Sequence, residues 1–548
     1  MSKYQWSYFF SLVFSFPALS AAATLQVDKN DLSCNDTTGT PFCSISAGID
    51  AAADGDTITI SAGTYSENPT ILKSLTISGA GSDLTIVDGG ARDRVFFTQG
   101  TIAISNLTVR NGDAGDSGLG GGIWANMGSL TLTDSVVSNN TASDGGGIGT
   151  AGQLTLVRTV VSDNTATNSF GTSSGGGLYI GGSATQTTIS DSTISNNTSD
   201  YQAGGIFNIG QATTVTNSTI SGNLTLGSGG GGALVNGSGS SANIVLSSVT
   251  ITNNTADTYS GGILNNYGQI RLHNSLVAGN SDSGYAPDCA GQTITSDGYN
   301  FIGTTAGCAL SQGTGDQLNQ GVSTARLAPL ASNGGTTPTH AIQMGSTVID
   351  AGDPSGCTDA NSNLLTTDQT GGTRTVDGNA DTISICDIGA FELKHGVLID
   401  SGNVPLTTTE GMGMASFDVV LISQPSSDVT ISLASSDTTE GTVSPNVLTF
   451  TAANWSVRQQ VVITGADDSD TDGDVGYEIA IGPTSSLDPD YDNLDLAAVS
   501  VTNMDDEGSS TSTQDEGGSG GGGAIDLALL LALIADIGRR AAVRKRLN

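Results

Sequence analysis

Six stretches of this chain align with one another: DSVVSNNTASDGGGI (134–148), RTVVSDNTATNS (158–169), DSTISNNTSDYQAGGI (191–206), NSTISGNLTLGSGGGGAL (217–234), SVTITNNTADTYSGGI (248–263) and NSLVAGNSDSG (274–284). An asparagine recurs at one aligned position in all six, at intervals of 24 to 33 residues. Such intervals are typical of solenoids and other repeat arrays. The units are shorter than propeller blades and lack helical periodicity, so they predict short strands that stack from one repeat to the next.

A parallel β-helix accounts for the composition of these repeats. Val, Ile and Leu would point into the coil, while Thr and Ser would point outward. Asparagine tolerates the left-handed backbone of sharp corners, and aligned asparagines can stack amide to amide. We therefore predict an asparagine ladder of Asn140, Asn164, Asn197, Asn223, Asn254 and Asn280. Glycine is 76 of 548 residues, and the GGGI-type runs supply further corners before inward Ile123, Ile148, Leu178, Ile206 and Ile263.

The N-terminal stretch extends the same architecture. It predicts a short helix at 45–53, followed by strand, turn and strand. Its motif resembles the opening of secreted right-handed β-helix proteins of the pectate-lyase-like superfamily, and the GGGI repeats also look like those of polymorphic outer-membrane proteins. The matching residues are Gly55, Asp56, Thr57, Ile58, Gly63, Thr64, Tyr65 and Glu67.

The repeats end near residue 285, and residues 285–393 resemble the closing module called choice-of-anchor Q. Its signature is matched by Asp368, Gln369, Arg374, Cys386, Asp387, Ile388, Gly389, Ala390, Phe391 and Glu392. Thr370 stands where the family has an Arg, which removes that arginine's contacts. We expect this module to cap the open end of the solenoid. The right-handed parallel β-helix is thus predicted over 24–393.

Both ends of the chain predict sorting signals. Residues 1–23 have the charged start, apolar run and small residues of a secretory signal peptide. Residues 508–523 form a Gly-, Ser- and acid-rich linker, and residues 524–548 form an apolar helix followed by a basic tail. This tail resembles the GlyGly-CTERM sorting tail of Gram-negative bacteria. The resemblance implies transient anchoring in the inner membrane, cleavage by a rhomboid-type protease and display on the cell surface. A permanent anchor or an amphipathic helix is the alternative.

Residues 400–507 resemble a Calx-β-like β-sandwich, so the predicted fold class is all-β throughout. Residues 400–516 carry 21 acids and one base, Arg458. The acids at 467–474 begin like a calcium loop, and the resemblance adds acids near the two ends of the sandwich. The possible calcium ligands are Glu410, Asp467, Asp468, Asp470, Asp472, Asp474, Asp505 and Asp506. A solvated acidic loop is the alternative.

Six cysteines in an exported chain predict disulfides. Fifteen pairings are formally possible. Sequence-local pairs stay close in a rod, which favours Cys34–Cys43, Cys289–Cys308 and Cys357–Cys386.

The charge narrows the functional classes. The chain has 53 acids and 17 bases, which argues against a nucleic-acid partner and favours divalent cations. A polysaccharide lyase on this fold would need acids and a basic residue, for which Arg158, Arg271, Asp134, Asp163 and Asp191 are available. Arg158, Asp134 and Asp191 share a repeat position with Asn217 and Asn274, which favours a corner role. His273 is interpreted as a surface residue beside the ladder.

Three functions remain open from the sequence. The first is a non-catalytic surface scaffold that binds an extracellular glycan or another cell. The alternative is a secreted polysaccharide lyase or glycoside hydrolase acting in a groove of the β-helix. The fold allows either one, and a purely structural stalk is a third possibility.

Overall fold

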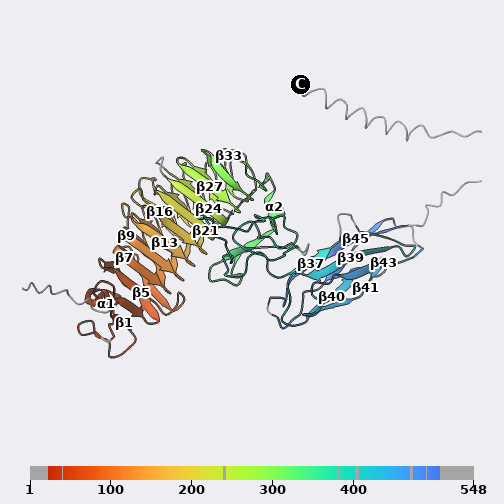
Figure 1. Ribbon diagram of the computed structural model, residues 1–548, viewed down its shortest axis with the longest axis horizontal. Coiled ribbons are helices and arrows are strands. Elements are labelled where there is room, and N and C mark those ends of the chain that lie inside the picture. Colours follow the sequence, from red (N-terminus) through yellow and green to blue (C-terminus); the bar gives the residue numbers. More distant parts are fainter. Residues whose placement is uncertain are drawn as a thin grey trace, which may run out of the picture.

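The computed structural model describes residues 22–39, 41–237, 242–379, 383–401, 406–469, 473–488 and 490–505. The signal peptide (except Ala22 and Ala23), the linker from 508 and the apolar tail therefore lie outside the described residues. Within the described part, no helix is both long enough and apolar enough to cross a membrane. The described chain forms a parallel β-solenoid followed by a module on its flank and a two-sheet domain (Figure 1).

The solenoid is built from four parallel ladders, in which each strand pairs with the equivalent strand of the next coil. The first ladder contains β1 (Thr24–Val27), β2 (Thr57–Ile60), β5 (Leu75–Ser78), β7 (Phe96–Ser105), β9 (Ile123–Thr133), β13 (Gln153–Val157), β17 (Thr187–Ser190), β21 (Ala212–Ser221), β24 (Asn243–Thr252), β27 (Gln269–His273), β31 (Ile294–Gly298) and β33 (Leu310–Ser311).

The second ladder shares β21 and β24 with the first. Its other strands are β3 (Gly63–Tyr65), β6 (Thr85–Asp88), β8 (Thr108–Arg110), β10 (Val136–Ser138), β14 (Val160–Ser162), β18 (Thr193–Ser195), β28 (Leu276–Val277), β32 (Phe301–Ile302) and β34 (Gln317–Leu318).

The third ladder uses the first halves of β7 and β9, and the fourth is a separate sheet of six short strands. The third adds β4 (Thr70–Ile71), β12 (Ile148–Thr150), β16 (Leu178–Ile180), β20 (Ile206–Asn208), β23 (Leu234–Asn236), β26 (Ile263–Asn265) and β30 (Cys289–Gly291). The fourth consists of β11 (Thr141–Ala142), β15 (Thr165–Ala166), β19 (Thr198–Ser199), β22 (Leu224–Thr225), β25 (Thr255–Ala256) and β29 (Ser281–Asp282).

The interior of the solenoid is filled by aliphatic rows from these ladders. Leu130, Leu154 and the equivalent residues of neighbouring coils are buried in one continuous core. The helix α1 (Ile45–Ala51) joins this core at the N-terminal end through Ile45 and Ile49. It ends two residues earlier than the segment predicted at 45–53. The solenoid fold is therefore confirmed, and its N-terminal coil is covered by a helix.

The matched residues of the N-terminal motif hold α1 in place. The Asp56 carboxylate accepts hydrogen bonds from the amides of Ala23 (2.7 Å) and Ala53 (2.8 Å). The Glu67 carboxylate accepts from the amides of Ile45 and Ser46, both at 2.9 Å, at the start of α1. The two carboxylates therefore have a structural role: they fix the position of α1 against the first coils.

The six aligned asparagines lie in a row inside the solenoid. Each Nδ2 donates to the Oδ1 of the next asparagine at 2.9–3.0 Å. The same Oδ1 also accepts the backbone N–H of the preceding asparagine. The row begins where Asn140 Oδ1 accepts from Gly112 and ends where Asn280 donates to Asp288 Oδ1 at 3.0 Å. The buried amides therefore connect every coil from Asn140 to Asn280.

Left-handed corners recur in register, but the ladder asparagines are not the residues that form them. The residue just before each ladder asparagine has positive φ: Asn139, Asp163, Asn196, Gly222, Asn253 and Gly279. A second corner lies six residues before the ladder, with φ of 46–55° at Asp134, Arg158, Asp191, Asn217, Ser248 and Asn274. The corner interpretation of Asp134, Arg158 and Asp191 thus agrees with the backbone. The ladder asparagines themselves do not have positive φ, and their side-chain amides point into the solenoid.

The three disulfides predicted from local spacing are confirmed: Cys34–Cys43, Cys289–Cys308 and Cys357–Cys386. The last of these lies in the segment after the coils. That segment begins with α2 (Val322–Ala325) and the antiparallel pair β35 (Leu327–Ala331) and β36 (Thr339–Ile342).

This closing module (322–393) folds back along the flank of the second ladder. Gln369 Nε2 donates to Thr193 Oγ1 (2.9 Å), and Thr219 Oγ1 donates to Gln369 Oε1 (2.6 Å). The Ala390 amide donates to Thr250 Oγ1 at 3.0 Å. Figure 1 shows the module, in green and teal, beside the middle coils. We expected a cap over the last coil; instead, rows of outward threonines provide a docking surface across several coils.

The signature residues of this module form a buried polar network. Arg374 donates to Asn217 Oδ1 and to Gly389 O, both at 2.9 Å, and lies 3.5 Å from the Glu392 carboxylate. Asp387 accepts from the amides of Asp350 (2.8 Å) and Leu393 (2.7 Å). The network joins the module to a solenoid corner at Asn217.

The second domain packs two sheets around one core that includes Phe417, Ile431 and Ile463. One sheet contains β37 (Val397–Asp400), β39 (Met414–Leu421), β43 (Gln459–Gly465) and β41 (Gly441–Ser444). The other contains β38 (Leu406–Thr409), β45 (Val499–Met504), β44 (Val475–Ile481), β40 (Val429–Ser435) and β42 (Val447–Phe450).

The asparagine ladder yields a test of stability. Asn197→Ala removes hydrogen-bond partners of Asn164, Val161 and Asn223 inside the solenoid. Buried groups without partners are costly, so we expect the free energy of unfolding to fall by about 2–4 kcal/mol. The adjacent Asn196→Gly, at a left-handed corner, should change it by less than about 1 kcal/mol. Urea unfolding of both variants measures the difference, and equal losses would contradict the assigned role.

The closing module should respond to pH. Burial raises the pKa of Asp350 to about 7, compared with about 3.9 in an unfolded chain. The protonated folded form is therefore favoured, and this contribution to stability is lost as the pH rises from about 4 to 7. Asp350→Asn removes that loss, so the variant should gain stability relative to wild type over this range. Melting temperatures at a series of pH values test this, and a constant difference between the two proteins would contradict it.

Candidate functional site

The outward face of the third ladder carries an apolar stripe. Along this ladder the outward positions of successive coils are paired in register. The members of the stripe are Phe97, Trp124, Gly149, Tyr179, Phe207, Val235, Leu264 and Ala290. Because neighbouring strands are about 4.8 Å apart, the stripe has one outward position at each such step along the solenoid axis. Gly149 has no side chain, and Val235, Leu264 and Ala290 are buried.

The aromatic members of the stripe are ordered by their neighbours. The rings of Tyr179 and Phe207 stack with centroids 5.7 Å apart and planes 18° from parallel. The indole of Trp124 covers Gly149 on the next coil, where an added Cβ would lie 2.8 Å from the ring. Phe97, Trp124, Tyr179 and Phe207 are half-buried. Their exposed parts form an aromatic surface supported by the backbone beneath.

At its C-terminal end the stripe enters a groove of about 810 Å³. The floor is formed by Leu264 and Ala290, and Asp282 also lines the groove. Three tyrosines stand in the walls, on the loops that join the fourth ladder to the third. We call this the tyrosine groove; its tyrosines are Tyr201, Tyr259 and Tyr285.

The groove tyrosines differ from ordinary surface residues in exposure and backbone. Tyr285 is 92% exposed and Tyr259 is 64% exposed. Tyr259 has φ 41°, at the position that Gly230 fills with φ 73° one coil earlier. A bulky side chain with positive φ is strained, and such strain is concentrated at functional sites. The chain therefore keeps a ring at a position where glycine would be easier.

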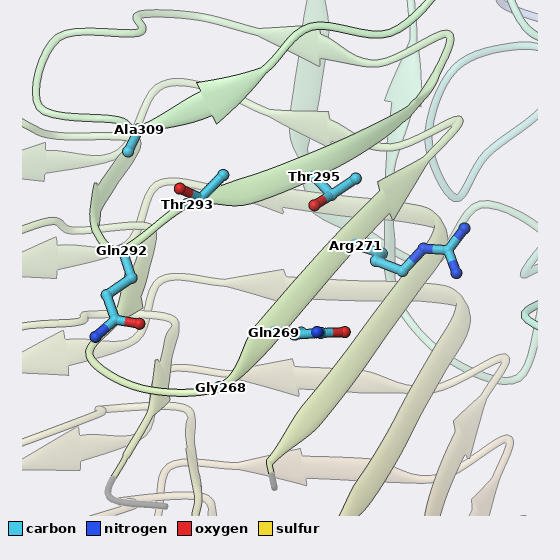
Figure 2. A pocket seen from close by; sticks show the side chains of 7 residues that line it. All are labelled: Gly268, Gln269, Arg271, Gln292, Thr293, Thr295 and Ala309. Atoms are coloured by element: carbon cyan, nitrogen blue, oxygen red, sulfur yellow. The ribbon is translucent and has the colours of Figure 1, made fainter. Parts of the chain in front are cut away.

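A second concavity of about 690 Å³ lies on the first ladder. Figure 2 shows Gln269 and Arg271 on β27, with Thr295 on the neighbouring strand and Gln292 on the preceding loop. Arg271 is held by the Asp297 carboxylate in two hydrogen bonds of 2.8 and 2.9 Å. This surface is polar, with its guanidinium already paired, so it offers less to a sugar ring than the stripe.

The residues considered for lyase chemistry are mostly engaged as structure. Arg158 makes two hydrogen bonds of 2.7 and 2.8 Å to Asp134 on the preceding coil. Asp163 lies at a left-handed corner. Arg158 and Asp191 line a small pocket of about 330 Å³ beside the closing module, and burial raises the pKa of Asp191. His273 lies on β27 with its Nε2 buried and without a hydrogen-bond partner.

Several of the acids proposed for calcium lie at one end of the two-sheet domain. The register of β38 and β45 pairs Thr409 with Met504, so Glu410 and Asp505 follow side by side. Glu410 is 2% exposed, and Asp505 accepts the Gly473 amide at 3.0 Å. Asp467 and Asp468 follow β43, and Asp474 precedes β44. Asp470, Asp472 and Asp506 lie outside the described residues.

Sequence reasoning missed Glu440 at this end. Glu440 is 7% exposed, accepts from Asn503 at 3.4 Å, and its carbonyl accepts the Ala466 amide. In the part of the chain that is described, no group of three or more His, Cys, Asp or Glu is arranged to hold a metal.

The aromatic stripe was also missed, although the sequence contains its signal. The residue after the inward Ile or Leu of the GGGI-type runs is Trp124, Gly149, Tyr179, Phe207, Val235 or Leu264, so it is never charged and is aromatic in three of these runs. Likewise an aspartate precedes each groove tyrosine by one to three residues, in Asp200–Tyr201, Asp257–Tyr259 and Asp282–Tyr285. Both patterns appear only when the repeats are compared at positions other than the asparagine.

The comparisons with known proteins do not indicate a function for this chain. No family model and no curated protein matches the chain. Among solved structures, the crystal structure of the E. coli chaperone DraB shows a local similarity at 8% identity, with a TM-score of 0.16. The matched part covers 20% of this chain and 56% of the DraB chain.

Proposed function

We propose that this protein is an exported, surface-attached β-helix scaffold that binds extended glycans along the aromatic stripe. The observation that carries the proposal is the shared register of Trp124, Tyr179 and Phe207 on the outside of the third ladder, with Gly149 on the coil between Trp124 and Tyr179. Sugar rings present C–H groups that pack on aromatic faces, while their hydroxyls bond with polar groups around them. The step between coils is close to the length of one sugar residue, so a linear glycan fits along the solenoid axis.

Binding accounts for the site better than catalysis does. Arg158 and Asp134 neutralise each other at solenoid corners, whereas Phe97, Trp124, Tyr179 and Phe207 are partly exposed on four coils of the third ladder. The secretory signal and the sorting tail, both inferred from the sequence, support display on the outside of a Gram-negative cell. The tail would pass through the inner membrane and meet a rhomboid-type protease. We also propose that the β-helix is right-handed. This handedness and the choice-of-anchor Q, Calx-β and GlyGly-CTERM assignments are inferred from sequence resemblance.

Substitutions in the stripe test the proposal. Removing an aromatic ring that stacks on a sugar costs about tenfold in affinity, and we expect this loss for Trp124→Ala and for Tyr179→Ala. Phe170→Ala is a matched control, because Phe170 is 80% exposed on a loop outside the stripe. A glycan array on the purified protein selects the ligand, and calorimetry measures each variant. Unchanged affinity in both stripe variants, with intact melting temperatures, would contradict the proposal.

Calcium is the proposed cofactor of the second domain. The buried acids Glu410 and Glu440 and the neighbouring Asp505 lie at one end of this domain and carry the type of oxygen donor that Ca²⁺ prefers; in the described residues they do not form a complete metal site. Bound calcium would offset their mutual repulsion.

Calcium should therefore raise the melting temperature of this domain, since a ligand that binds only the folded state stabilises it. The rise should shrink in Glu410→Gln and persist in the control Asp428→Asn, which changes an exposed acid. Scanning calorimetry with calcium and with EGTA measures it, and identical melts in both conditions would count against the cofactor.

A further inference from the structure

The tyrosine groove is lined by an acidic side chain and by no basic one in the described residues. Its described lining includes the Asp282 carboxylate and no Lys or Arg. Asp200 and Asp257 lie on the same loops that carry Tyr201 and Tyr259. Three aromatic faces and a carboxylate together attract a cation, because the ring faces are negative. The chain as a whole has a net charge of −36, which adds to that preference.

Asp282 is the last residue of β29, where the loop that carries Tyr285 begins. Its Oδ2 accepts the amides of Ser260 and Ala286, both at 3.3 Å. Asp282 is half-buried, so its charge is less screened than that of a fully exposed acid. Two long hydrogen bonds leave acceptor capacity for a further donor. The groove thus has an anionic acceptor beside apolar and aromatic walls.

We propose that the tyrosine groove selects glycans carrying free amino groups, with a protonated sugar amine bound between the tyrosines and Asp282. This inference rests on the proposed function, because the remainder of the glycan would lie along the stripe. The ammonium group would donate to the Asp282 carboxylate while the sugar ring packs on a tyrosine. Acidic polysaccharides are disfavoured by the same charges. The ligand class is therefore a cationic amino-sugar polymer.

Retention of Tyr259 at a strained corner supports the assignment. Glycine serves the equivalent corner of the preceding coil, so the ring is not required to form the turn. In this assignment, the tyrosine contributes its aromatic face to the ligand.

The test uses two ligands that differ only in the amine. Chito-oligosaccharides of equal length, fully deacetylated or fully acetylated, share one backbone, and the buffer is acidic enough to charge the amines. We expect the purified protein to bind the deacetylated ligand about tenfold more tightly. Asp282→Asn should remove most of this preference and leave affinity for the acetylated ligand within about twofold. Tyr259→Gly should also reduce the preference without lowering the melting temperature.

The control is Asp428→Asn, which changes the net charge by the same amount on the other domain. Equal affinity for the two ligands would overturn the inference and leave the stripe proposal standing. An equal loss of preference in Asp428→Asn and Asp282→Asn would also overturn it, since attraction would then come from overall charge. Loss of affinity for both ligands in Trp124→Ala, with the preference retained, supports the inference. If no glycan binds at all, the proposed function fails and this inference fails with it.

Discussion

The structure depends on the axial hydrogen bonds that set one coil above the next. Backbone pairing in the four ladders fixes the step between coils, and the buried amides from Asn140 to Asn280 fix the register. A coil cannot shift along its strand without breaking the contacts that each asparagine makes to both neighbours. The precise alignment of outward side chains, on which the candidate site depends, is a consequence of this internal constraint.

That register aligns two kinds of outward-facing side chains into rows along the solenoid. One row is covered by the closing module, and the other is not. The threonines Thr193, Thr219 and Thr250 of the second ladder are covered by the closing module and bond with its side chains or backbone. The aromatic residues of the third ladder remain at the surface. One flank of the solenoid is therefore used for intramolecular packing, while the aromatic residues on another flank stay partly exposed.

Much of the solenoid could be predicted from sequence because its signals are repeated. Asn197 and its equivalents recur at one position, and Asp134, Arg158 and Asn217 share a corner, so substitution among the repeats reveals a backbone role. The flank position of the closing module could not be predicted, because Gln369 and Arg374 find their partners about 150 residues away, at Thr219 and Asn217. The stripe escaped prediction because its members differ in residue type, from the indole of Trp124 to Gly149 and Ala290, and have in common only their position after an inward residue. Tyr259 could not be singled out until its backbone angle was known.

The position of the closing module has a mechanical consequence. If the chain is tethered to a surface by its C-terminal end, any pull reaches the solenoid through this module. The module is hydrogen-bonded to the side of the coils from Thr193 to Thr250. A pulling force would therefore act in shear on several coils at once. A terminal cap would instead transmit the load to the last coil and open the stack one coil at a time. Side-on attachment should therefore let the solenoid bear a larger pull from its C-terminal end before its coils separate.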